Sequence, residues 1–380
     1  MKVSIRNFEN HGGIAMRNHE VTVPQFLLDK NGEIAEPGWA RSQVWRYSRD
    51  MIKANKLRVK EWDYYLIASK DFALALTVSD DGYIGLQSVS LLTFGGTPWE
   101  HTETVLNLFP MGKQKMPASS RQGDVVFDNG RLSIRYELSP GQRHIKCSFK
   151  QFNGDKDLKC DVILHEDPND DSMVIATPWN EKHAFYYNQK INCMPAEGTV
   201  EYDGHTYRFD PEHDFGTLDW GRGVWTYDNT WYWGSGNARI DGHRFGFNLG
   251  YGFGNTSAAT ENVIFWDGKA HKLDDVKFCI PNDNGPDPLN GTGEQVRPGM
   301  SGDMDSPEYM KEWTFTSSDG RFEAVFRPVL DRSAKIDLKA IISDQHQVFG
   351  LMSGTAVLDD GTPVEFKNML CFAEKVHNQY

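Results

Sequence analysis

Short segments in which apolar and polar residues alternate dominate the chain. Leu132 to Leu138 alternate over seven positions, and Phe322 to Phe326 follow the same rule. A period of two sends alternate side chains to opposite faces of a strand. Gly, Asp and Asn separate these runs, at a spacing that is typical of a β-sandwich or barrel. The pattern therefore predicts a mainly β protein with antiparallel sheets.

Further runs have the same β character, whereas only Ser42 to Asn55 and Trp99 to Leu108 have a pattern compatible with a helix. Strands that alternate regularly with helices, the mark of a parallel sheet, are not indicated, so we expect few short helices. The further β-type runs are Tyr64 to Val78, Tyr83 to Phe94, Thr199 to Phe209, Trp225 to Trp233, Phe245 to Phe253, Ile336 to Ile342 and Met369 to Ala373.

Two landmarks recur in the same order in both halves of the chain. Asp128 to Leu132 resembles Ser318 to Phe322, and Gly198 to His205 resembles Gly354 to Gly361. Each is a turn that opens a strand or closes a hairpin. Either hairpins recur by chance, or the chain is a duplication of two similar β-barrels. In the second case the boundary lies near residues 210–225.

The segment from Pro281 to Pro307 has no packed pattern. It holds five prolines and five glycines. A loop of this length within a compact domain is either a lid or a disordered surface excursion.

Composition limits the classes of partner. The chain of 380 residues has a formal net charge of −13, which disfavours nucleic acid. It contains 11 Trp, 14 Tyr and 22 Phe. So many aromatic residues indicate a site for a hydrophobic or ring-bearing small molecule.

Targeting and cofactor signals are not found in the sequence. No apolar stretch has the length of a signal peptide or a membrane span. The five cysteines are scattered without a C-x-x-C pair, so we expect reduced thiols in the cytoplasm. Since no P-loop, nucleophile elbow, dinucleotide fingerprint or paired histidine ligands occur, we expect neither a cofactor nor a metal.

The densest cluster of aromatic and titratable residues runs from Glu212 to Trp233. A carboxylic acid or imidazole held against indole rings loses water, which raises a carboxyl pKa and keeps the acid protonated. The ring faces can also stabilise a cationic intermediate. The alternative interpretation is a Trp-rich hairpin with its acids at turns. The residues in question are His213, Asp214, Asp219, Trp220, Trp225, Trp231, Tyr232 and Trp233.

A glycine-rich strand follows this cluster. From Phe245 to Phe253 the odd positions are bulky and apolar, and the even positions are Gly or Asn. One face therefore packs, and the other leaves room for curvature or for a ligand. Both interpretations stay open, and Phe247 and Tyr251 are candidate ligand contacts.

A basic run precedes a second aromatic cluster. Residues 41–60 carry seven Lys or Arg against one Asp. Such a run either receives an anionic group of a ligand, or it forms a solvated face or pairs with acidic patches elsewhere on the chain. Arg41, Trp62 and Tyr64 are candidate ligand contacts here. His346 is a further candidate, with a hydrogen-bonded structural histidine as its alternative.

Several segments resemble signatures of a bacterial family of unknown function, the uncharacterised-domain family number 2804. The likeness covers nearly the whole chain but implies no settled activity. The segments are Gly38-Trp39-Ala40-Arg41, Lys60-Glu61-Trp62-Asp63-Tyr64-Tyr65, His346-Gln347-Val348-Phe349-Gly350 and Phe372-Ala373-Glu374.

More remotely, Asp219-Trp220-Gly221 followed by the tryptophan-rich strand is similar to the carotenoid hydratase and tocopherol cyclase group. The resemblance implies two lipocalin-like antiparallel β-barrels or sandwiches in tandem, at residues 1–215 and 216–380. It implies Asp219 or His213 as proton donor, Trp220 and Trp233 as cavity lining, and Tyr232 as an orienting group. In this chain His213 stands apart from the Trp-Gly pair, which departs from the hydratase pattern.

These observations together predict a cofactor-independent acid–base enzyme, of the hydratase, isomerase, cyclase or lyase type. Its ligand would be a hydrophobic, unsaturated or aromatic small molecule. One alternative is a lipocalin-like carrier of such a molecule. Another is a carbohydrate-active protein, because sugars also stack on tryptophan and carboxylate pairs hydrolyse glycosides.

Overall fold

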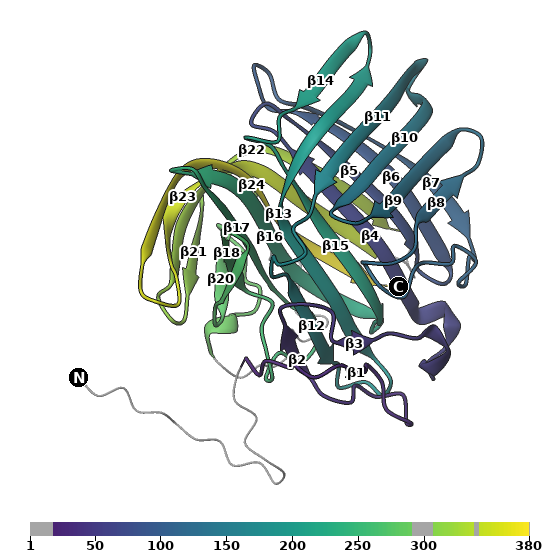
Figure 1. Ribbon diagram of the computed structural model, residues 1–380, viewed down its shortest axis with the longest axis vertical. Helices are drawn as coiled ribbons and strands as arrows, with labels where there is room; N and C mark the ends of the chain where they lie inside the picture. Colours follow the sequence, from purple (N-terminus) through teal and green to yellow (C-terminus); the bar gives the residue numbers. More distant parts are fainter. Residues whose placement is uncertain (1–17, 291–306, 338–341, 380) are drawn as a thin grey trace.

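The computed structural model describes residues 18–290, 307–337 and 342–379, and within them the chain is built from strands that pair antiparallel, apart from the short parallel pair β1 and β3 (Figure 1). Three single-turn 3₁₀ helices complete the secondary structure of these residues. The prediction of a mainly β protein is confirmed. The strands are β1 Gln25–Phe26, β2 Gly38–Ala40, β3 Trp45–Arg46, β4 Val59–Ala68, β5 Phe72–Asp80, β6 Ile84–Thr93, β7 Trp99–Leu108, β8 Val125–Asp128, β9 Leu132–Ser139, β10 Gln142–Asn153, β11 Lys156–His165, β12 Met173–Pro178, β13 Phe185–Tyr202, β14 His205–Phe209, β15 Phe215–Val224, β16 Asp228–Ile240, β17 His243–Tyr251, β18 Val263–Trp266, β19 Lys269–Lys272, β20 Val276–Cys279, β21 Trp313–Ser317, β22 Phe322–Asp337, β23 Ile342–Val357 and β24 Pro363–Gln379, and the 3₁₀ helices are η1 Arg49–Met51, η2 Lys56–Arg58 and η3 Pro288–Asn290.

Two large sheets contain nearly all of these strands. The first has thirteen strands, and its main path runs β7-β6-β5-β4-β15-β13-β11-β10-β9-β8. The long strand β13 also pairs with β12 and β14, and β12 in turn pairs with β2. The second sheet has nine strands in the order β19-β18-β17-β16-β24-β23-β22-β21-β20.

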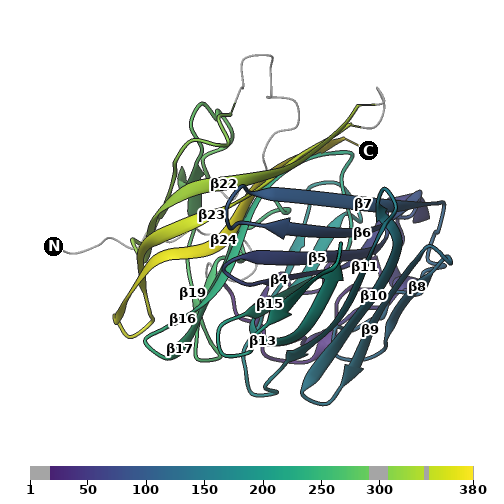
Figure 2. The same ribbon diagram turned by 90° about the horizontal axis from the view of Figure 1, so that it is seen from above.

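Each sheet curls into a half-barrel that encloses its own apolar core (Figures 1 and 2). A third apolar cluster lies between the sheets and combines residues of both. Figure 2 shows β22, β23 and β24 passing beside β4 to β7, and β13 and β15 lie against β16 and β17. We call this contact region the interface. The architecture of two curled antiparallel half-barrel sheets agrees with the predicted fold class.

The chain passes from the first sheet to the second between β15 and β16. The division at residues 215 and 216 therefore falls at the start of β15, and it stays a prediction. The landmarks of the suggested repeat are turns between β8 and β9, β21 and β22, β13 and β14, and β23 and β24.

The two helical candidates do not form α-helices, and this expectation was wrong. Trp99–Leu108 is the strand β7, which pairs along its whole length with β6. The pairing with β6 therefore determines the extended conformation of this segment and overrides its local sequence preference. In the segment 42–55 the structure has the short strand β3 and a single 3₁₀ turn.

The segment expected to be a lid or a disordered loop is described only in part, because residues 291–306 lie outside the described residues. Its first part packs on the second half-barrel. There Asp283 accepts a hydrogen bond from the Tyr232 hydroxyl at 2.7 Å and pairs with Lys375 Nζ at 2.7 Å.

Candidate active site

Strand β15 places the three residues of the Asp-Trp-Gly segment on alternate faces. Asp219 faces the interface, whereas Trp220 points into the first half-barrel, where its ring lies 4.1 Å from the Arg222 guanidinium. Gly221 faces the interface again. A Cβ atom there would lie 1.9 Å from the Trp62 ring, so only glycine leaves room for that indole.

Asp219 is half of a buried ion pair. Its Oδ2 lies 2.8 Å from Lys190 Nζ, and its Oδ1 accepts a hydrogen bond of 2.6 Å from Asn188. Lys190 Nζ also lies 3.9 Å from the centre of the Trp233 ring. Lys190 is only 1% exposed, so these partners replace the water that would otherwise solvate its ammonium group.

Two further carboxyl groups, Glu374 and Glu261, lie beside this ion pair. Glu374 Oε1 accepts a hydrogen bond of 3.1 Å from Trp231 Nε1, and its Oε2 accepts one of 2.8 Å from Gln347. Burial raises the pKa of Glu374 to about 7, although these two donors and nearby positive charges oppose the rise. A carboxyl group with a pKa in this range is present in both its acid and its base form near neutral pH.

Glu261 lies in the same region, in a space that a glycine leaves open and beside a tyrosine hydroxyl. A Cβ atom at Gly250 would lie 1.9 Å from Glu261 Oε1, so the glycine face of β17 makes space for this carboxyl group. The Tyr186 hydroxyl lies 3.4 Å from Oε2. Burial raises the pKa of Glu261 to about 7, with the positive charge of Lys190 opposing the rise.

Aromatic rings surround the four charged groups. Trp225 contacts Trp62 edge to face at 5.5 Å and Trp231 at 5.1 Å between ring centres. Tyr64 contacts Trp233 in the same way at 5.8 Å. These rings exclude water from the carboxyl groups, which is the physical cause of the raised pKa values.

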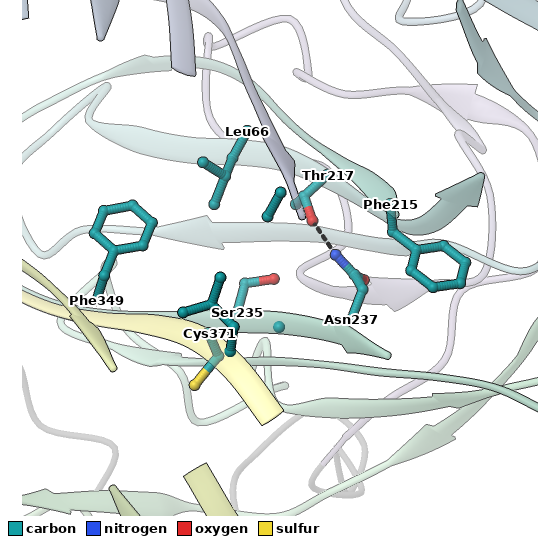
Figure 3. Close-up of a pocket in the computed structure, with 10 residues that line it drawn as sticks. Leu66, Phe215, Thr217, Ser235, Asn237, Phe349 and Cys371 are labelled. Atoms are coloured by element: carbon teal, nitrogen blue, oxygen red, sulfur yellow. Dashed lines mark hydrogen bonds between the residues drawn. The ribbon is translucent and has the colours of Figure 1, made fainter. Parts of the chain in front are cut away.

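A pocket opens in the interface next to this cluster (Figure 3). The pocket is partly open to solvent: the space between its walls together with the solvent in front of them is about 340 Å³, and its cavity volume is about 20 Å³. Asn237 donates a hydrogen bond of 2.7 Å to Thr217 Oγ1 across it. The lining residues are Leu66, Ala68, Phe215, Thr217, Ser235, Gly236, Asn237, Phe349, Leu370 and Cys371.

The register of the first sheet relates the pocket to the charged cluster. Leu66 pairs with Thr217 in the pocket wall, and Tyr64 pairs with Asp219 in the cluster. Leu66 and Thr217 are each two positions from a cluster residue on the same strand and face. The separation is about 7 Å.

The second sheet repeats this relation. Ser235 and Phe349 line the pocket, and Trp233 and Gln347 lie two positions away on the same strands. Glu374 pairs with both Trp233 and Gln347. The pocket wall formed by Ser235 and Phe349 therefore lies one strand repeat from Glu374.

The structure brings together six of the residues predicted from sequence and separates the others. Those at the interface are Asp219, Trp62, Tyr64, Trp225, Trp231 and Trp233.

The remaining predicted proton-transfer groups lie elsewhere. His213 is exposed in the turn before β15, at least about 13 Å along the strand from Asp219. Asp214 is buried there and accepts a hydrogen bond of 2.8 Å from the Asp210 backbone N–H. Burial raises the pKa of Asp214, which closes this turn and does not face the interface cluster.

The predicted residues Tyr232, Tyr251 and Phe247 face the interior of the second half-barrel. Tyr232 and Tyr251 stack at 4.4 Å. His346 lies on that side too, stacked on Tyr309 at 3.8 Å, with its Nδ1 2.7 Å from Asp331 Oδ2.

Arg41, which was predicted to bind an anionic group of a ligand, forms ion pairs at the surface. It contacts Glu20 at 3.0 Å and Asp171 at 3.0 Å. Other members of the basic run are also paired with acidic residues, such as Arg58 with Glu181 at 2.5 Å. In the structure these arginines are therefore engaged with acidic residues of the chain itself, and an anion-binding role for this run stays a prediction.

Sequence analysis missed Lys190, Glu261 and Glu374. A signal for Glu374 existed, because Phe372-Ala373-Glu374 is one of the segments that carry the family resemblance. The other resembling segments also send a side chain to the interface, namely Trp39, Trp62 and Phe349. For Lys190 the only signal was a lysine within an otherwise buried strand.

Two other kinds of feature are absent from the described part of the chain. No group of three or more His, Cys, Asp or Glu is arranged there to hold a metal ion. Among the same residues, none of the helices has the length and apolar character needed to cross a membrane.

Comparison with protein families places the chain. The model of a domain of unknown function, DUF2804, matches residues 18–380. The chain therefore belongs to this family, as the resembling segments indicated. No curated protein matches the chain.

Three solved structures are similar to the chain at low identity. A candidate AttH protein from Nitrosomonas europaea has 11% identity and a TM-score of 0.46, over 88% of this chain and 96% of that one. Kievitone hydratase from Nectria haematococca has 11% identity and a TM-score of 0.42, over 88% and 92%. CghA has 9% identity and a TM-score of 0.35, over 94% and 97%.

Proposed function

We propose that the protein is a cofactor-independent acid–base enzyme of the hydratase, isomerase, cyclase or lyase type. Its substrate is a hydrophobic, unsaturated or aromatic small molecule that enters the interface pocket. The observation that carries this proposal is the buried Glu374 carboxyl group, held by Trp231 and Gln347 one strand repeat from the pocket. A carboxylic acid in that place can protonate a carbon–carbon double bond.

The four buried charged groups have different roles in the proposed reaction. Asp219 is paired with Lys190 and serves as a fixed anion. Glu374 donates the proton and becomes a carboxylate that the Trp231 and Gln347 donors stabilise. The cation left on the substrate then loses a proton to a carboxylate, giving an isomer, or it adds water, which loses a proton to the carboxylate and gives a hydrate. Glu261 is the second group available as base, because its Oε1 has no hydrogen-bond partner among the described residues.

Solvent deuterium tests the proposal. The protein is incubated in D₂O with a panel of unsaturated aromatic and terpenoid compounds, and deuterium on carbon is followed by mass spectrometry and NMR. Because general acid catalysis contributes about 10²–10⁴-fold, we expect Glu374→Gln to slow the incorporation by about 100-fold or more. Glu365→Gln is the matched control, since Glu365 is exposed on the same strand.

Each other outcome has a meaning. Incorporation that persists in Glu374→Gln would refute this assignment of the acid. Compounds that bind without carbon deuteration would indicate a carrier. Release of a reducing sugar from glycosides incubated in the same way, without carbon deuteration, would indicate glycoside hydrolysis.

A further inference from the structure

Arg332 is a cation that reaches across the interface. It lies on β22, where its register partner Gln347 belongs to the charged cluster. Its Nη1 donates a hydrogen bond of 2.9 Å to Ser90 Oγ on β6 of the other sheet. Ser90 is 1% exposed, so the guanidinium end lies where the two sheets meet.

No carboxylate of the described residues forms an ion pair with Arg332. The nearby acids already have partners. Asp331 binds His346 at 2.7 Å, and Glu374 binds Trp231 and Gln347. Most other arginines described in the structure have an acidic partner, so Arg332 has an unused capacity for a planar anion.

The position of Ser90 brings this capacity next to the pocket. Leu66 of the pocket wall pairs with Ala75, and Ala75 pairs with Ser90. All three are on one rung of the first sheet, and two strand spacings of about 4.8 Å separate Leu66 from Ser90. A ring beside Leu66 with a side chain of two or three carbons therefore reaches the Arg332 guanidinium.

We propose that the ligand of the interface pocket is an aromatic or unsaturated carboxylic acid whose carboxylate binds Arg332. The inference rests on the proposed function for the pocket as the substrate site, and it specifies the substrate class. The apolar part lies between Leu66 and Phe349, and the carboxylate forms the bidentate pair that a guanidinium favours.

A ligand carboxylate bound to Arg332 would also change the protonation of Glu374. The Lys190 and Asp219 charges cancel, and the positive charge of Arg332 lowers the pKa of Glu374. A ligand carboxylate on Arg332 offsets that charge. Glu374 then takes up a proton as the substrate binds, so it is in its acid form in the substrate complex.

The test compares trans-cinnamate with cinnamamide, which differ in charge and hardly in shape. Affinities are measured by ligand-observed NMR and calorimetry for the full chain and its variants. We expect the wild-type protein to bind cinnamate about tenfold or more tightly than cinnamamide, the effect of a hydrogen-bonded charge. Arg332→Gln removes this preference and leaves cinnamamide binding unchanged. Arg327→Gln, on the exposed face of the same strand, keeps the preference.

Ser90→Ala provides a milder variant if Arg332→Gln does not fold. It removes the hydrogen bond that positions the guanidinium and should reduce the preference for cinnamate several-fold. Equal binding of the two probes by the wild-type protein, binding of neither, or an unchanged preference in the folded variants would overturn the proposal.

Proton uptake separates this inference from the proposed function. Near pH 7, cinnamate binding should take up a fraction of a proton and cinnamamide binding none, measured in buffers of different ionisation enthalpy. Glu374→Gln should keep cinnamate binding and lose the uptake. If the charge preference holds while no compound is deuterated, the anion site stands and proton-transfer catalysis fails. If deuteration is found only for neutral compounds, proton-transfer catalysis stands and the anion site at Arg332 fails.

Discussion

Replacing Lys190 with methionine removes one half of the buried ion pair and leaves the other half without its charge partner. The Asp219 carboxylate would keep only the hydrogen bond from Asn188. Breaking a buried pair on one side costs about 3–5 kcal/mol, whereas replacing both charges by apolar groups is often nearly neutral. Lys190→Met should therefore lower the free energy of unfolding by about 3–5 kcal/mol.

The double variant Lys190→Met/Asp219→Leu should regain most of this loss. We expect a coupling energy of about 3 kcal/mol in the double-mutant cycle. Urea unfolding near pH 7, followed by tryptophan fluorescence, measures all four members of the cycle. Lys146→Met is the control, because Lys146 pairs with Glu137 at 2.9 Å with 38% and 36% of the side chains exposed. Such exposed pairs contribute about 0–1 kcal/mol.

Additive effects of the two substitutions would refute the reasoning. A coupling energy below about 0.5 kcal/mol is that of independent sites. Asp219 would then not be the fixed anion of the interface, and its role as proton donor would be open again.

Three further predictions concern individual residues. Burial raises the folded-state pKa of Glu374 from 4.5 to about 7, so the stability gained from its protonation is complete below about pH 4.5 and is lost as the pH rises through 7. In urea titrations between about pH 5 and 8, the free energy of unfolding of Glu374→Gln should therefore fall by about 3 kcal/mol less than that of the wild-type protein, and parallel curves would contradict this. Gly221→Ala forces a Cβ against the Trp62 ring and should destabilise by about 1–3 kcal/mol in thermal unfolding, whereas an unchanged midpoint would show that the indole can move. His213→Gln alters an exposed turn and should change stability by less than about 0.5 kcal/mol and leave any deuteration rate intact; a large loss of rate would restore His213 as a proton-transfer group.

The period of a strand explains which predicted residues could be placed from sequence. Asp219 and Trp220 are adjacent on one strand, so they face opposite sides, and the structure sends only Asp219 to the interface. The same rule separates Tyr232 from Trp231 and Trp233. Alternation within each strand was therefore sufficient to divide the cluster into two faces.

The remaining site residues depend on the order of strands within the sheets. Glu374 meets Trp233 because β24 lies next to β16, and Lys190 meets Asp219 because β13 lies next to β15. Nothing in the local sequence specifies these neighbours, which are set by tertiary packing. The glycine at 250 was read as a choice between curvature and a ligand wall. In the structure it accommodates the carboxyl group of Glu261.

The proposed proton transfer requires two carboxyl groups between the sheets that titrate near neutral pH. A ¹³C NMR titration of the protein labelled at the Glu side-chain carboxyl carbon measures this without a substrate. We predict two resonances with midpoints near pH 7, one lost in Glu374→Gln and the other in Glu261→Gln. If every glutamate has its midpoint below about pH 5, the interface holds no acid suited to proton transfer, and the account is contradicted.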